Sequence, residues 1–144
     1  MAQIHALTPD GRLPSAAIEH VQEIAVPRTT GWRDITAWVQ NRVSGRILIR
    51  RDENTLVFVL DELVLSVSGS VSVNRFPTGL RPLYRIRGDW FPALAATEGG
   101  SVSISGGGYC NIYGVVADQA MSARIVGDFY DGYQFPSPYP GDPA

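Results

Sequence analysis

Residues 63–73 read LVLSVSGSVSV, and this stretch decides the fold class. Serines hold one parity of the alternation, and Gly69 interrupts it as a bulge or bend. The apolar positions on the other parity are Leu63, Leu65, Val67, Val71 and Val73. A period of two places one face of a strand in a core and the other in water. The stretch therefore predicts a half-buried β-sheet.

Strand-like patterns continue throughout residues 31–127. Short runs rich in β-branched residues alternate with turns, such as those at residues 52–54 and at Gly106, Gly107 and Gly108. Besides 63–73, the predicted strands are residues 46–50, 55–60, 102–105, 109–116 and 122–126. Several short strands without a helical period indicate an all-β fold, either a β-sandwich or a barrel. Of the two we predict an antiparallel β-sandwich of jelly-roll-like type.

The chain divides into three parts. Residues 1–30 form an N-terminal extended or helical segment for attachment and oligomerisation, and residues 31–127 form the sandwich domain. Residues 128–144 are rich in proline and aromatic side chains, so we expect an extended tail that does not continue the sheet.

The N-terminal segment contains a short helical candidate, in which Ser15 is the N-cap and Pro27 ends the run. Its apolar stripe includes Ile18, Val21 and Ile24. A helix of about ten residues is not stable alone in water, so this stripe must dock. It packs either on its own domain or against copies and neighbouring proteins.

Composition excludes several classes of protein. The chain has 144 residues, a formal net charge of -2 and 18% charged residues, which argues against nucleic-acid binding and against disorder. Its N-terminus lacks the pattern of a signal peptide, and no apolar run is long enough for membrane insertion. These features predict synthesis in the cytoplasm.

The sequence contains no constellation typical of an enzyme or a metal site. Asp61 and Glu62 are adjacent, which in a strand points them to opposite faces. His5 and His20 have no zinc-type spacing, and Cys110 fits a small buried side chain. Arg87-Gly88-Asp89 is an adhesion-type tripeptide, but such short matches arise by chance. We expect no catalytic residues, no metal and no cofactor.

Aromatic side chains near strand ends and turns are the candidates for glycan or subunit contact, because they stack on sugars or fill interfaces. These candidates are Trp32, Trp38, Tyr84, Trp90, Tyr109 and Tyr113. Packing in the core or between subunits is the competing interpretation for each of them.

Several segments resemble the minor tail proteins of bacteriophages that infect actinobacteria, and together they cover nearly the whole chain. The most specific are GRILIRRDENTLV (45–57) and PTGLRP (77–82). The others are the leader ALTPDGRLPSAAIEHV (6–21), GWRDIT (31–36), FPA (91–93) and YCNIYGVV (109–116). Two departures are Glu53 and Asn54 in place of a glycine turn, and the lack of a shaft-like repeat.

The resemblance implies a virion component of the phage tail tip or baseplate, built as a homotrimeric β-sandwich that helps the particle contact the host envelope. Its partners would be other tail proteins, through the N-terminal segment, and a host cell-envelope glycan. From the residues themselves, PTGLRP is a rigid turn in which Gly79 permits a positive φ and Arg81 ties the turn to a carboxylate.

Three functions from different classes remain open. The favoured one is a structural, receptor-binding component of a phage tail. The second is a stand-alone carbohydrate-binding, lectin-like module, which would usually carry a signal peptide or an attached enzyme. The third is a small β-sandwich enzyme, which lacks any nucleophile or acid–base pair to support it.

Overall fold

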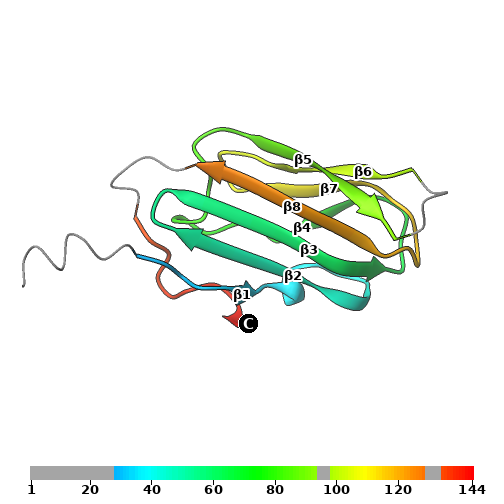
Figure 1. Ribbon diagram of the computed structural model, residues 1–144, viewed down its shortest axis with the longest axis horizontal. Helices are drawn as coiled ribbons and strands as arrows, with labels where there is room; N and C mark the ends of the chain where they lie inside the picture. Colours follow the sequence, from blue (N-terminus) through cyan, green and yellow to red (C-terminus); the bar gives the residue numbers. More distant parts are fainter. Residues whose placement is uncertain (1–27, 94–97, 129–133) are drawn as a thin grey trace, which may run out of the picture.

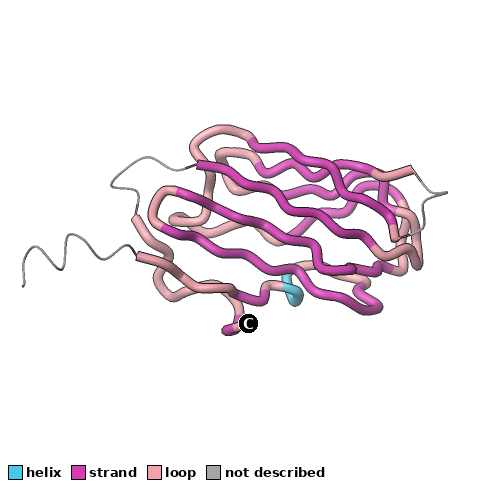
Figure 2. Tube along the Cα trace, in the orientation of Figure 1, coloured by secondary structure: helices cyan, strands magenta, loops and turns pink. Residues whose placement is uncertain are grey.

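The computed structural model describes residues 28–93, 98–128 and 134–144. In this part of the chain, nine antiparallel strands form one strongly curled sheet, a half-barrel with the order β4-β7-β6-β5-β8-β3-β2-β1-β9 (Figure 1). The strands are β1 (Arg33–Asp34), β2 (Arg42–Asp52), β3 (Thr55–Leu65), β4 (Gly69–Val73), β5 (Ile86–Pro92), β6 (Gly100–Ile104), β7 (Cys110–Val115), β8 (Met121–Asp128) and β9 (Asp142–Pro143). Figure 2 shows how strands dominate, with a single helical turn, η1 (Thr36–Trp38).

The all-β, antiparallel part of the predicted fold class is confirmed, but two separate sheets are not observed. Strand β5 is the reason. Ile86 to Trp90 pair with β6, whereas Phe91 and Pro92 pair with β8, so one strand belongs to both halves. The sheet therefore continues through β5 and curls over on itself. The helical candidate with Ile18, Val21 and Ile24 lies outside the described residues.

The decisive stretch 63–73 supplies parts of two strands that lie far apart in the sheet. Strand β3 ends at Leu65 and β4 begins at Gly69, which has a φ of 102°. Strand β4 then pairs with β7 at the far edge of the sheet. The predicted inward side chains of both strands are nevertheless buried, because the parity of the alternation survives the crossing.

Three strands were not predicted. Strand β5 contains Gly88 and two charged residues, which weaken a strand pattern, and β1 is only two residues long. Strand β9 corrects the expectation that the C-terminal tail adds nothing to the sheet, because Asp142 and Pro143 pair with β1. Proline is tolerated there because β9 is an edge strand.

The core fills the inside of the curl. Figure 1 shows β2, β3 and β8 as one wall and β4, β6 and β7 as the other. Phe58 from β3 and Ile104 and Ile112 from β6 and β7 are all completely buried in this core. Trp90 lies there too, and its indole N–H donates to the Tyr113 carbonyl at 2.8 Å. The buried polar end of Trp90 is therefore satisfied.

A charged side chain, Arg51, also points into the curl. It is 1% exposed and shares the inward parity of β2 with Ile47 and Ile49. Its guanidinium donates to the carbonyl oxygens of Glu53 at 3.0 Å, Gly79 at 2.7 Å and Gln134 at 2.5 Å.

Arg51 therefore ties together three segments that are distant in the sequence. Its guanidinium carbon lies 4.3 Å from the centroid of the Phe135 ring, and that of Arg28 lies at the same distance from this ring. Burial lowers the pKa of Arg51, and the nearby Arg28 acts in the same direction.

The PTGLRP segment is a turn, as predicted, and it belongs to the same cluster of contacts. The Leu80 N–H donates to the Pro77 carbonyl at 3.1 Å, and Gly79 has a φ of 98°. A side chain at Gly79 would collide with the backbone of residues 134–136, so glycine is needed for the close approach as well. Arg81 does not bind a carboxylate as expected. Its Nε donates to the Phe76 carbonyl at 2.8 Å.

We expect Arg51→Met to lower the free energy of unfolding by about 3 kcal/mol, because the carbonyl oxygens that accept from the guanidinium would be left buried and unpaired. Arg50→Met is the matched control on the outer face, where Arg50 forms a half-exposed ion pair with Asp52 that is worth about 1 kcal/mol or less. Urea unfolding followed by tryptophan fluorescence measures both. Equal losses in the two variants would contradict the anchoring role of Arg51.

Candidate functional site

A surface cleft of about 480 Å³ lies beside the edge strand β4. On one side lies β4 with the chain that leads into it, and on the other lies the segment that joins η1 to β2. The cleft is lined by Trp38, Gln40, Asn41, Val67, Ser68, Ser70, Val71, Ser72, Val73 and Asn74. We call this the seam cleft.

The seam cleft lies where the half-barrel fails to close. The Asn74 N–H donates to the Trp38 carbonyl at 2.9 Å, and the Ser66 N–H donates to the Asn41 carbonyl at 2.9 Å. These two bonds hold the opposing segments at both ends. No ladder forms between them in the described chain, because β4 pairs only with β7. The walls are therefore fixed while the space between them stays open.

The chemistry of the lining is uncharged and rich in hydrogen-bonding groups. None of the described residues that line the cleft is ionisable at neutral pH. Gln40, Asn41 and Asn74 bring carboxamides, which both donate and accept, and the serines bring hydroxyls. Trp38 adds an aromatic side chain. Such a surface matches a neutral, polyhydroxylated ligand, which needs many hydrogen bonds and an apolar face for stacking.

Of the aromatic candidates, only Trp38 lines the seam cleft. It is half-buried, and its ring centroid lies 5.8 Å from that of Phe76, so the core fixes its position. Trp90 is completely buried, which removes it from any surface contact in this structure. Trp90 therefore packs in the core, which was the competing interpretation for each aromatic candidate.

The remaining aromatic candidates are dispersed over the surface. Tyr84 is 71% exposed in the loop before β5, and Tyr109 is 55% exposed with the Arg75 guanidinium carbon 4.5 Å from its ring centroid. Tyr113 projects outward from β7. Trp32 lies at the other end of the sheet, where the Ala144 N–H donates to its carbonyl at 3.1 Å.

The carboxamides and serines of the seam cleft were missed as functional candidates. The serine parity of residues 66–72 was interpreted only as a wet face, because the pattern does not show what that face meets. A signal was present in the positions of the three carboxamides. Gln40 and Asn41 come just before β2, and Asn74 comes just after β4. Only the curl brings them together.

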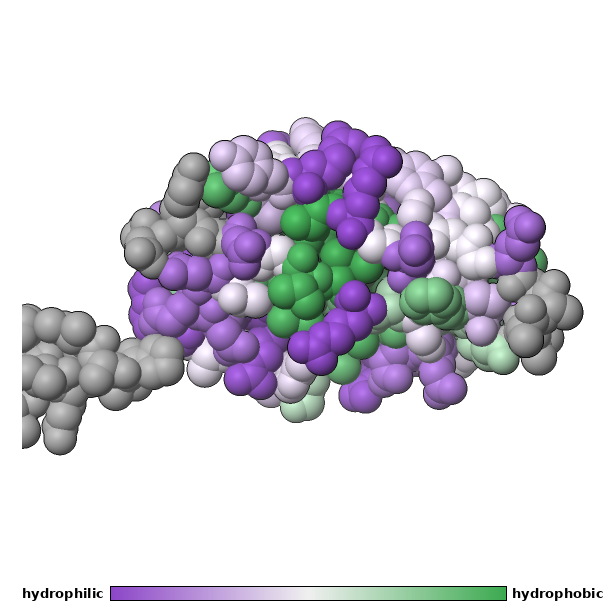
Figure 3. All heavy atoms as spheres, turned by 45° about the horizontal axis from the view of Figure 1, so that its top comes forward, coloured by the Kyte–Doolittle hydropathy of each residue, from purple (hydrophilic) through white to green (hydrophobic). Residues whose placement is uncertain are grey.

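A second surface feature is apolar. Figure 3 shows hydrophobic surface in the middle of one face, flanked by hydrophilic side chains. The register of β2, β3 and β8 accounts for this band, because it places Leu48, Val59 and Val126 on the outer parity. Val57 shares this parity but is only 6% exposed. Val126 is 51% exposed. An ion pair between Arg46 and Asp61, with 2.9 Å between Nη2 and Oδ2, lies at one end of the band.

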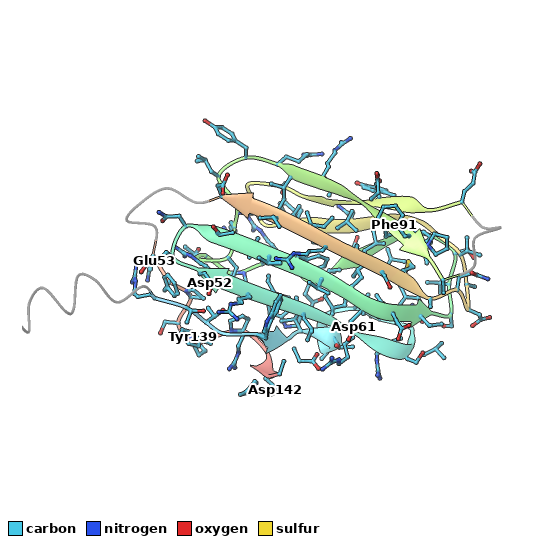
Figure 4. All side chains as sticks on the ribbon, in the orientation of Figure 1. Asp52, Glu53, Asp61, Phe91, Tyr139 and Asp142 are labelled. Atoms are coloured by element: carbon cyan, nitrogen blue, oxygen red, sulfur yellow. The ribbon has the colours of Figure 1, made fainter. Side chains whose placement is uncertain are left out.

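Carboxylates that drew attention in the sequence serve structural contacts. Figure 4 shows Asp52 and Glu53 at one end of the molecule, and Asp61 farther along the sheet. The Thr29 hydroxyl donates to Asp52, and the backbone N–H of Arg28 donates to Glu53. Within the described ranges, no group of three or more His, Cys, Asp or Glu side chains is arranged to hold a metal ion.

A scan against models of known protein families and a search of curated proteins found no match to this chain. In the part of the chain that the structure describes, no helix has the length and apolar character needed to cross a membrane.

Cys110 provides a test of the packing behind this surface. It is 1% exposed at the start of β7, and burial raises the pKa of its thiol to about 12. At pH 8 we expect no reaction of the native protein with a thiol-specific reagent, and one equivalent of reaction after unfolding in urea. The chain has no other cysteine, so the signal is unambiguous. Rapid stoichiometric labelling of the native protein would contradict the packing.

Proposed function

We propose that this chain is a host-adhesion domain of a phage tail tip or baseplate, and that its seam cleft binds a neutral glycan of the host cell envelope. The seam cleft is the observation that carries this proposal, because its uncharged carboxamides and hydroxyls and its tryptophan suit a sugar better than an ion or a nucleotide. The sequence resemblance to minor tail proteins of actinobacteriophages supports the location in the virion.

The positions of the chain ends favour this arrangement. The described chain begins at Arg28, where Thr29 bridges to Asp52 and the N–H of Glu53 donates to the Arg28 carbonyl, at the β2–β3 turn. Asn41 in the seam cleft precedes the opposite end of β2, about 30 Å away along the strand. Attachment at the Arg28 end would leave the seam cleft directed away from the tail.

The proposal includes the jelly-roll-like assignment of the fold. Its support is that the two halves of the curled sheet, joined at β5, pack their inner faces on one core, as the sheets of a sandwich do. The alternative, a stand-alone lectin-like module, uses the same cleft without a virion. The two differ in assembly, because a tail component requires partners and a lectin-like module does not. We propose no enzymatic activity.

We expect the intact protein to bind polysaccharide purified from an actinobacterial envelope, measured by isothermal titration calorimetry. The double variant Gln40→Ala with Asn74→Ala should bind at least about tenfold more weakly, because two hydrogen bonds of about 1 kcal/mol each are lost. Trp38 is left unchanged because it packs on Phe76.

Gln134→Ala is the matched control, since this residue lies beside Arg51 at the other end of β2. It removes a carboxamide without touching the seam cleft, and its affinity should equal that of the unmodified protein. Binding that is unchanged in the double variant would exclude the seam cleft as the site. A complete lack of binding by the unmodified protein would favour a scaffolding role in the baseplate.

We also propose that the chain assembles as a homotrimer through Ile18, Val21 and Ile24, so light scattering should give a mass near three times 15.7 kDa. Val21→Asp with Ile24→Asp should dissociate it, because aspartate in an apolar contact is left unpaired. Val126→Asp is the control, because it places the same charge in the apolar band on β8 and leaves the N-terminal segment unchanged. Its mass should equal that of the unmodified protein. An unchanged mass in the N-terminal variant would refute the proposed contact, and a monomeric unmodified protein would favour the lectin-like alternative.

A further inference from the structure

The outer face of strands β4 to β7 carries rows of polar side chains that run across the sheet. Val102, Ile104, Cys110 and Ile112 point into the core, so the residues between them point outward. The strand register places the outward residues in two rows. The first row is Arg87, Ser103, Asn111 and Ser72, and the second is Asp89, Ser101 and Tyr113.

The first row begins in the seam cleft. Ser72 lines the cleft, and its hydroxyl donates to Oδ1 of Asn111 on β7 at 2.9 Å. From Ser72 the row crosses three interstrand spacings to reach Arg87, which is about 14 Å. A ligand that leaves the cleft over β4 therefore meets Asn111 next and Arg87 at the far end, while Ser103 between them is only 4% exposed.

The far end of the row carries groups that have no internal role. Arg87 and Asp89 are exposed, and among the described residues neither forms an ion pair or a side-chain hydrogen bond. They alternate with the buried Trp90 and with Gly88, whose missing side chain makes room for Ile125 in the core. The inward parity of β5 thus serves packing, and the outward parity is left to contact a ligand.

The side chains of these rows are shorter on β6 than on the neighbouring strands β5 and β7. Ser101 and Ser103 on β6 are short, whereas Arg87 and Asp89 on β5 and Tyr113 on β7 are long. Ser101 and Ser103 thus form a low line between two lines of larger side chains, and of these two serines Ser103 is only 4% exposed. Tyr113 is 37% exposed, which makes its ring available for stacking, and Ser101 separates it from Asp89 in the second row.

We propose that the ligand is an extended oligosaccharide that lies across β4, β7, β6 and β5, with one end in the seam cleft and the other at Arg87. This inference rests on the proposed function and deepens it, because it states that the site recognises a chain of several sugars and not a single terminal sugar. Asn111 binds its middle, and Arg87 and Asp89 bind hydroxyl groups at its far end; Ser103, which is 4% exposed, lies under the chain without binding it.

The test uses a size series, from monosaccharide to hexasaccharide, prepared by partial hydrolysis of the envelope polysaccharide. We expect the affinity of the intact protein to rise at least tenfold along the series and then level off. Arg87→Gln should lower the affinity for the longest fragments at least fivefold and leave the affinity for the shortest unchanged, because only a long chain reaches Arg87.

Arg124→Gln is the matched control, since Arg124 is exposed on β8, outside both rows. It should leave every affinity unchanged, and circular dichroism confirms that both variants are folded. An affinity independent of length, or an equal loss for all fragments in Arg87→Gln, would overturn this inference alone. Absence of binding by the undigested polysaccharide would overturn the proposed function, and the inference with it.

Discussion

The buried guanidinium of Arg51 is the contact on which the organisation of the molecule depends. A charge without water must be surrounded by acceptors, and here the acceptors are backbone carbonyl groups of the β2–β3 turn, the PTGLRP turn and the C-terminal segment. Phe135 lies against the guanidinium and also against that of Arg28, so the entry of the chain into the domain joins the same cluster. Hydrogen bonds to this side chain, together with backbone bonds such as that from the Glu53 N–H to the Arg28 carbonyl, hold one end of the half-barrel together.

The opposite end of the half-barrel, at the seam cleft, is defined by the unpaired edge of β4. Because β5 belongs to both halves of the sheet, the strands curl continuously from β9 to β4 and leave β4 with a free edge. Two backbone hydrogen bonds hold that edge near the segment of Trp38 and Asn41 without forming a ladder. An open edge is usually an aggregation hazard, which serine-rich, short strands reduce. The same serines give the seam cleft its uncharged polar lining.

These two ends suggest a division of labour in the proposed adhesion domain. The closed end receives the chain from its N-terminal segment, and the open end and the adjoining outer face present carboxamides, hydroxyls, Arg87 and Asp89. A rigid sheet suits this role, because binding groups held on strands lose little conformational freedom when a ligand arrives. The apolar band around Val126 lies on β8, β3 and β2, apart from the two rows of polar side chains on β4 to β7.

The sequence by itself determined the all-β, antiparallel character of the fold, most of the strands and the parity of residues 63–73, because a period of two is a local property. It correctly placed Leu63 and Val73 in the core and Cys110 in a buried position. The inward direction of Arg51 was not predicted, because Ile47, Leu48 and Ile49 are all apolar and show no alternation. Only the tertiary structure decided the partner of each strand, the continuity through β5, the burial of Trp90 and the meeting of Gln40, Asn41 and Asn74. Strand pairing depends on contacts between residues distant in the chain, and no local pattern specifies these.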